Sequence, residues 1–318
     1  MVIFPTGRRA PRRRPGAWPS CFALSNIWHA KAWHGRMSSM RFGINTMLWT
    51  ANFSAADLPI LDKAKAWGYD GVEILLVDPQ AFPAAALYQA CLAKGLGLTA
   101  VGIASLENNP LSADAGVRRH TLDYFRACIK ALAEAGGEMI AGPMYAPLGH
   151  FTGVRRTADE WKRSVEFFQE LAPTLDAHRI TMALEPLNRF ETYFLNTAAD
   201  SVAFCQAINH PRIGILFDTF HANIEEKSIA EGYRTVGPYL KHVHTCENDR
   251  GTPGSGHVDW TGVFQALHDV NYDGWLTIES FGSALKEISA AARIWRDLEK
   301  DMDTLAADGL RFLKSSYN

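Results

Sequence analysis

Four chemically reactive side chains close four successive β-rich runs in the second half of the chain. Glu185, Asp218 and Glu279 each follow or end an apolar run, and His244 ends the run Leu-Lys-His-Val-His. Three carboxylates brought close together repel one another and raise each other's pKa. A divalent cation is the usual means of keeping such a cluster ionised, so the pattern predicts a metal site.

Each of these residues also has an ordinary structural interpretation. A lone carboxylate at a strand end could pair with a lysine or arginine. His242 and His244 share a face, because side-chain direction in a strand repeats every two residues, and either could be a hydrogen-bonded core histidine. His242 fits that interpretation better than His244. Four such coincidences at one edge are much less expected than one, and this favours the metal site.

The types of ligand limit the metal. Three carboxylates and one imidazole are mainly hard donors, so we expect one Mn²⁺ ion per subunit, with Co²⁺ or Mg²⁺ as alternatives. Cys246 lies in the loop after His244 and is not needed to complete the set. Four protein ligands would leave about two positions of an octahedral ion open for substrate oxygens.

The elements that must position these residues alternate regularly from Met40 onward. Short β-rich runs are separated by longer helical patterns, and a last helix is expected over residues 284–305. The predicted strands are residues 42–47, 71–76, 98–103, 139–143, 180–185, 213–218, 240–245 and 275–279. Such alternation indicates an α/β protein with a parallel sheet, and eight units favour a single (β/α)8 TIM barrel. In that fold the catalytic groups lie at the carboxyl ends of the strands.

Charge is unevenly distributed along the 318 residues. Residues 1–39 contain seven Arg or Lys and no acid, so residues 40–318 carry a net charge of about −9. Such an acidic body is a poor partner for the phosphate backbone of nucleic acid. No apolar run reaches the roughly 20 residues of a membrane helix. The five scattered cysteines fit a reducing cytoplasm. We therefore expect a cytoplasmic protein without a nucleic-acid or membrane partner.

Residues 1–39 do not share the alternating pattern. The segment is rich in Arg and Pro between Arg8 and Arg14 and could be a targeting peptide, although no apolar stretch of secretory length follows. We favour an extension that is disordered or that results from a start codon placed upstream of Met37 or Met40. Residues 40–318 would then be the catalytic barrel domain.

Four segments around the strand ends resemble one known family. They read Ala-Leu-Glu185-Pro-Leu-Asn-Arg-Phe-Glu191, Phe-Asp218-Thr-Phe-His221, His242-Val-His244-Thr-Cys-Glu-Asn-Asp-Arg250 and Thr-Ile-Glu279-Ser-Phe281. Over about residues 40–310 the chain is similar to the ketose 3-epimerases, the group of D-tagatose, D-allulose (psicose) and L-ribulose 3-epimerases. This group belongs to the xylose-isomerase-like barrel superfamily. The strand-end carboxylates are typical of the whole superfamily, whereas Glu191, His221 and Arg250 are more specific to the group.

The resemblance implies roles for residues beyond the four ligands. Glu191, His221 and Arg250 would contact the ketose oxygens around C1–C3, and Phe281 would help to wall the site. The group often has an aromatic residue on the first strand, where this chain has Asn45. Trp49, just beyond, would then supply that part of the wall.

The implied reaction is inversion at C3 of a free ketose such as D-tagatose, D-fructose, D-allulose or L-ribulose. It would proceed by removal and return of a proton through a cis-enediolate. Glu185 and Glu279 would be the two acid–base groups, on opposite faces of this planar intermediate. The resemblance also implies a homodimer or homotetramer.

Three other functions stay open at this point. An aldose–ketose or hydroxypyruvate isomerase on the same barrel would share the metal ligands and differ in its product. An abasic-site endonuclease uses a related barrel, but it needs more histidine ligands and a basic surface. A sugar-binding protein without catalytic activity would have little use for a desolvated group of carboxylates.

Overall fold

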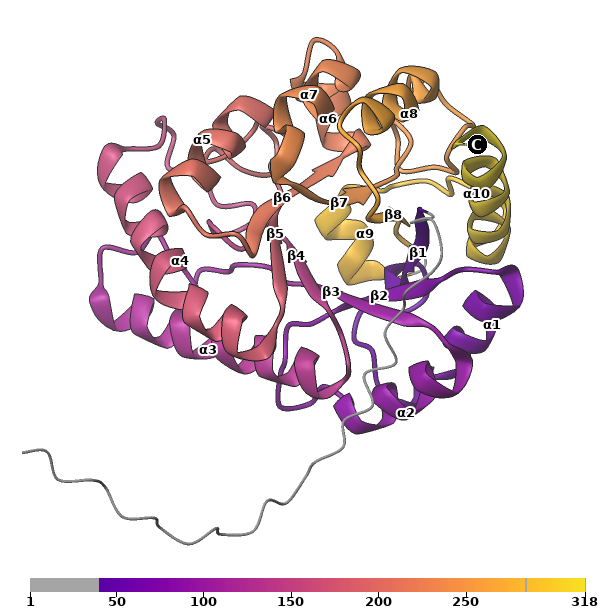
Figure 1. The fold of residues 1–318 in the computed structure, drawn as a ribbon, viewed down its shortest axis with the longest axis horizontal. Coiled ribbons are helices and arrows are strands. Elements are labelled where there is room, and N and C mark those ends of the chain that lie inside the picture. The colour runs from indigo at the N-terminus through magenta and orange to yellow at the C-terminus, as the bar shows by residue number, and fades with distance from the viewer. Residues whose placement is uncertain (1–39, 284, 318) are drawn as a thin grey trace, which may run out of the picture. The chain divides into compact units, whose positions relative to one another are not determined.

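The chain forms a closed barrel of eight parallel strands (Figure 1). The computed structural model describes residues 40–283 and 285–317. The strands are β1 (Arg41–Asn45), β2 (Gly71–Leu75), β3 (Gly97–Val101), β4 (Met139–Gly142), β5 (Thr181–Leu184), β6 (Ile213–Asp218), β7 (Leu240–His244) and β8 (Trp275–Ile278). Each strand pairs with the next, and β1 pairs with β8, so the ring has no edge. The predicted α/β class and single TIM barrel are confirmed.

Every predicted strand is present, with ends that differ from the prediction by two residues at most. The segment 1–39, for which we predicted an extension or a misplaced start, lies outside the described residues. Within the described part of the chain, no helix combines the length and the apolar character that a bilayer crossing requires.

Helices follow the strands, and most of them lie on the outside of the barrel. They are α1 (Pro59–Trp67), α2 (Ala84–Lys94), α3 (Ala115–Glu134), α4 (Ala158–His178), α5 (Ala198–Ile208), α6 (Thr219–Glu225), α7 (Ile229–Val236), α8 (Trp260–Asp269), α9 (Lys286–Ala292) and α10 (Met302–Tyr317). Helix α9 differs from the others in position, since Figure 1 shows it inside the ring of outer helices. It therefore lies close to the strand ends at which catalytic groups are expected.

The prediction of one last helix over residues 284–305 is wrong. Helix α9 ends where Arg293 adopts a left-handed backbone conformation, with φ at +59°. A new helix, α10, then begins at Met302, and the Asp301 side chain accepts a hydrogen bond from the Thr304 N–H at 2.7 Å. Asp301 thus acts as a helix N-cap, a start signal that the long helical pattern concealed.

Trp275, the first residue of β8, packs its side chain against the first residues of β2 and β3. Its indole is buried, its Nε1 donates to Glu138 at 2.6 Å, and the Arg41 guanidinium lies 4.2 Å from the ring centroid. The ring lies against Gly71 and Gly97, and a Cβ added at Gly97 would lie 2.7 Å from two of its atoms. Glycine at these positions makes room for the indole.

We expect Gly97→Ala to lower the free energy of unfolding by about 1–3 kcal/mol, because an extra carbon in a packed interior forces its neighbours to shift. Urea denaturation followed by circular dichroism measures this loss. In a Trp275→Phe background, where the clashing ring atoms are missing, the same substitution should cost less. An equal cost in both backgrounds would contradict the packing account.

Candidate active site

The structure gathers the four predicted metal ligands at the carboxyl ends of four adjacent strands. Asp218 is the last residue of β6 and His244 the last of β7, and Glu185 and Glu279 directly follow β5 and β8. One potential ligand atom from each residue lies within 4.8 Å of the others. All four side chains are buried. Residues chosen by their place at strand ends therefore do lie together.

Local hydrogen bonds turn Asp218 and His244 toward the cluster. Asp218 precedes α6, and its Oδ1 accepts a hydrogen bond from the Phe220 N–H at 2.8 Å, as a helix N-cap does. The other carboxylate oxygen of Asp218, Oδ2, remains available as a metal ligand. The Nδ1 atom of His244 lies 3.4 Å from Glu279 Oε2 and 3.8 Å from Glu185 Oε1. Each of these groups therefore offers at least one ligand atom to the same small volume.

The cluster has the unmatched atoms that a divalent cation requires. Glu185 Oε1 and His244 Nδ1 are buried and have no hydrogen-bond partner among the described residues. Arg250 Nη1 lies 2.7 Å from both Asp218 Oδ2 and Glu279 Oε2. One guanidinium thus pairs with two of the three carboxylates, Asp218 and Glu279, and the third, Glu185, has no ion pair with it. Carboxylate oxygens and an imidazole nitrogen of this kind fit a metal such as Mn²⁺ or Mg²⁺.

The environment separates the three carboxyl groups by pKa. Burial raises the pKa of Glu185 well above its usual range, and the neighbouring Glu279 raises it further. Burial also raises the pKa of Asp218, against the effect of Arg250. At Glu279 burial acts in the same direction, but the charges of His244 and Arg250 outweigh it and lower the pKa. Without a bound cation, the surroundings of Glu185 favour its protonated form and those of Glu279 favour its ionised form.

The cluster opens into a cavity that contains four of the five residues predicted to contact substrate. The polar and aromatic residues at this end are Glu185, Glu191, His221, Arg250, Glu279 and Phe281. The rest of the wall is apolar and consists of Met47, Leu75, Val101, Ile103, Pro143, Leu148, Leu187, Ile288, Ala291 and Ala292. The last three belong to α9, so this helix covers one side of the cavity. A few convergent polar groups within apolar walls are typical of small-molecule sites.

His221 is held in one orientation by contacts at both ring nitrogens. The Asn188 backbone N–H donates to Nδ1 at 3.1 Å, and Arg250 Nη2 lies 3.1 Å from Nε2. Both neighbours are donors, since a guanidinium has no acceptor atom, and a neutral imidazole can accept at one ring nitrogen alone. Burial lowers the pKa of His221 well below its usual range, and Arg250 lowers it further. His221 is therefore a neutral ring held between two donors, with Nε2 at 3.6 Å from Glu185 Oε1.

Arg250 adopts a backbone conformation that is uncommon outside glycine, with φ at +70°. Its carbonyl oxygen accepts a hydrogen bond from Ser280 Oγ. Its guanidinium lies over the Phe220 ring, 4.0 Å from the centroid, and 5.0 Å from that of Phe281. The predicted wall residue Phe281 thus also packs against the predicted substrate-binding arginine. Backbone strain of this kind is common at functional sites, where the surrounding structure maintains it.

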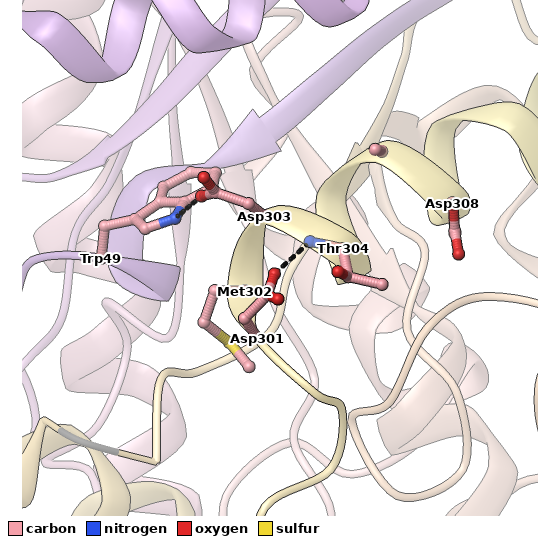
Figure 2. Close-up of a pocket in the computed structure, with 7 residues that line it drawn as sticks. Trp49, Asp301, Met302, Asp303, Thr304 and Asp308 are labelled. Atoms are coloured by element: carbon pink, nitrogen blue, oxygen red, sulfur yellow. Dashed lines mark hydrogen bonds between the residues drawn. The ribbon is translucent and has the colours of Figure 1, made fainter.

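Trp49 does not line the cavity, contrary to the role predicted for it. Figure 2 shows its indole directed toward the start of α10, where Nε1 donates to Asp303 Oδ1 at 2.8 Å. The ring also stacks on Trp67, with centroids 5.8 Å apart. The short 3₁₀ turn Thr46–Leu48 after β1 carries the chain outward, so Met47 reaches the cavity and Trp49 does not.

Two residues that support the site were missed from the sequence. Asn188 donates from Nδ2 to Glu191 Oε1 at 2.9 Å and presents its backbone N–H to His221. Glu73, in β2, accepts hydrogen bonds from Nε2 of both His242 and His244. A signal for Glu73 was available, since it is a lone charged residue inside the apolar strand Gly-Val-Glu-Ile-Leu.

Comparison with known proteins decides the family. Residues 61–316 match the xylose isomerase-like TIM barrel family. The chain belongs to this family. The closed barrel of eight strands is thus a known architecture, and the predicted superfamily is confirmed.

Within the xylose isomerase-like family the chain is similar to ketose 3-epimerases. A probable ketose 3-epimerase of Synechocystis sp. is 34% identical over 290 residues, which are 87% of this chain and 97% of the relative. D-psicose 3-epimerase of Ruminiclostridium cellulolyticum is 31% identical over 274 residues, 85% of this chain and 93% of that enzyme. The crystal structure of a D-allulose 3-epimerase from Methylomonas sp. in complex with D-allulose has a TM-score of 0.84 at 31% identity, covering 88% of this chain and 98% of that one. The predicted resemblance is confirmed, and the chain is an enzyme of the isomerase class.

We expect wild-type protein, freed of metal by a chelator, to bind one Mn²⁺ ion per chain in isothermal titration calorimetry. Asp218→Asn should weaken this binding by about 100-fold or more, because loss of a ligand costs at least as much as loss of a residue that supports one. Asp303→Asn is the matched control, since its carboxylate binds Trp49 outside the cluster, and it should keep wild-type affinity. Unchanged affinity in Asp218→Asn would remove Asp218 from the ligand set.

Proposed function

We propose that the enzyme inverts C3 of free ketoses, with Glu185 and Glu279 as its two acid–base groups. The observation that carries this proposal is the pair of buried carboxyl groups that reach one cavity from different strands, and their surroundings also shift their pKa values in opposite directions. Two titratable groups whose environments separate their pKa values are a common arrangement for acid and base roles. The relatives named D-psicose and L-ribulose 3-epimerase support the same reaction.

Glu279 and Glu185 share the removal and the return of the C3 proton. An ionised Glu279 takes the proton from C3 of one epimer, and a protonated Glu185 delivers a proton to C3 from the other side of the planar cis-enediolate. In the reverse direction the roles are exchanged. Because each group stands at the end of a different strand, β8 for Glu279 and β5 for Glu185, the sugar can lie between them. General acid–base catalysis by positioned groups typically contributes a factor of 10² to 10⁴ in rate.

The remaining polar residues orient the substrate. His221 can exchange a hydrogen bond with a sugar oxygen through Nε2, and Arg250 offers donors at the cavity. Glu191, which Asn188 holds through a hydrogen bond of 2.9 Å, accepts from a sugar hydroxyl. Burial raises the pKa of Glu191, against the effect of Arg250. These donors and acceptors fit the oxygens around C1–C3.

Glu185, Asp218, His244 and Glu279 would hold the divalent ion, with Mn²⁺ as our first expectation and Co²⁺ or Mg²⁺ as alternatives. When bound, such an ion acts as a Lewis acid that makes the proton beside a carbonyl easier to remove. The protein's part is to keep the ligands close together and away from bulk water. The buried cluster and the apolar wall of the cavity do both.

The cavity lining favours a free ketose over a phosphorylated one. Arg250 is the one cationic side chain among the lining residues, and it is paired with Asp218 and Glu279. A sugar phosphate usually binds to several free donors or cations. The apolar walls instead suit the carbon chain beyond C3.

Three expectations from the sequence stay proposals here. We propose that residues 40–318 constitute the catalytic domain. The resemblance supports a homodimer or homotetramer, which light scattering would establish. The five scattered cysteines support a cytoplasmic location.

The reaction can be established by incubating the Mn²⁺-loaded enzyme with D-fructose, D-tagatose and L-ribulose in D₂O. Nuclear magnetic resonance should show the C3 epimer of at least one ketose, with deuterium at C3 of the product. Deuterium at C1 or C2 together with an aldose product would contradict C3 epimerisation and indicate an aldose–ketose isomerase. Hydroxypyruvate is the matching test for a hydroxypyruvate isomerase.

Glu279→Gln should lower kcat for epimerisation by about 100-fold or more, since an amide cannot take the C3 proton. Some metal binding should remain, because the amide oxygen is still a potential ligand. Calorimetry with Mn²⁺ and the melting temperature separate loss of the base from loss of the ion or of the fold. Turnover close to that of the wild type would refute the scheme with two carboxyl groups.

A further inference from the structure

Glu73 is a buried carboxylate on β2 that contacts His244, one of the four predicted metal ligands. Four side chains donate hydrogen bonds to it. They are Asn45 Nδ2 and His244 Nε2 to Oε1, at 3.0 and 2.7 Å, and Thr99 Oγ1 and His242 Nε2 to Oε2, at 3.0 and 2.8 Å. The donors come from β1, β3 and β7, so the carboxylate is surrounded on both oxygens.

This arrangement determines which nitrogen of His244 carries a proton. An ionised carboxylate can only accept hydrogen bonds, so the Nε2 atom that faces Glu73 must be an N–H. A histidine that binds a metal must be neutral, and in that form of the ring the other nitrogen, Nδ1, has the free lone pair. It is Nδ1 that faces the cluster, 3.4 Å from Glu279 Oε2. The hydrogen bond from one side thus selects the ligand atom on the other.

The same three residues, Glu73, His242 and His244, are also close enough to be considered as a second metal site. The contacts favour hydrogen bonds instead. Each carboxylate oxygen already has two donors at 2.7–3.0 Å, which are ordinary hydrogen-bond lengths. A carboxylate with four donors has no free lone pair for an ion.

We propose that Glu73 is a positioning residue that sets the tautomer and the ring orientation of His244, so that Nδ1 is the atom that binds the metal. Ligating histidines commonly donate their second ring N–H to a carboxylate, and loss of such a partner typically lowers metal affinity 10- to 100-fold. This inference rests on the proposed metal centre. It adds a residue from β2, a strand that contributes no ligand to the cluster.

The experiment compares wild type with Glu73→Gln and with Thr99→Val. Glutamine keeps the size of the side chain but offers an N–H₂ group to one of the two imidazoles. Thr99→Val is the matched control, because it removes one donor to Glu73 and leaves both the carboxylate and the His244 contact in place. Isothermal titration calorimetry measures Mn²⁺ affinity, and circular dichroism verifies folding.

Nuclear magnetic resonance of protein labelled with ¹⁵N-histidine reads the His244 ring directly, in metal-free and in Mg²⁺-loaded samples. The His244 signal is identified by its absence in a His244→Asn variant. We expect a proton on Nε2 in wild type in both states. This readout needs neither turnover nor Mn²⁺.

Glu73→Gln should bind Mn²⁺ 10- to 100-fold more weakly than wild type and should alter or lose the Nε2–H signal, whereas Thr99→Val should stay within about threefold. Equal losses in the two variants would show a merely structural role and overturn the proposal. Wild-type His244 with its proton on Nδ1 and a bare Nε2 would overturn it even if Glu73→Gln did not fold. Failure of wild type to bind any metal would refute the metal centre alone, because the wild-type tautomer is read independently.

Discussion

Three buried carboxyl groups within a few ångströms of one another impose the main constraint on this structure. Two unit charges 4 Å apart repel by about 4 kcal/mol at an effective dielectric constant of 20. Arg250 compensates Asp218 and Glu279, both at 2.7 Å, but Glu185 Oε1 has no such partner among the described residues. The remaining charge must be removed by a proton on Glu185 or by a cation. A site that needs a cation in order to be fully ionised is well suited to bind one.

The barrel gathers these groups because parallel strands end at the same rim. Asp218 and His244 occupy paired positions of β6 and β7, in spite of a register shift earlier in that pair, between Ile215 and Leu216. Chain order alone therefore brings four ligands together, and this is why they could be predicted without a structure.

The parts of the site that were not predicted depend on contacts across the barrel or between loops. Glu73 and His244 are on β2 and β7, which β1 and β8 separate in the ring, and no local pattern connects them. The path of the chain after β1 depends on the turn Thr46–Leu48, so the sequence did not show that Met47, and not Trp49, faces the cavity. The division into α9 and α10 depends on a left-handed Arg293, which helical periodicity does not reveal.

Positive and negative groups alternate along the interior, and this couples the metal to protons. Glu73 holds the Nε2–H of His244, whose Nδ1 faces Glu185 and Glu279, and Arg250 lies beyond them. Since burial raises the pKa of Glu185 well above its usual range, a cation and a proton compete for this carboxyl group. Metal binding and protonation of the proposed acid are therefore linked.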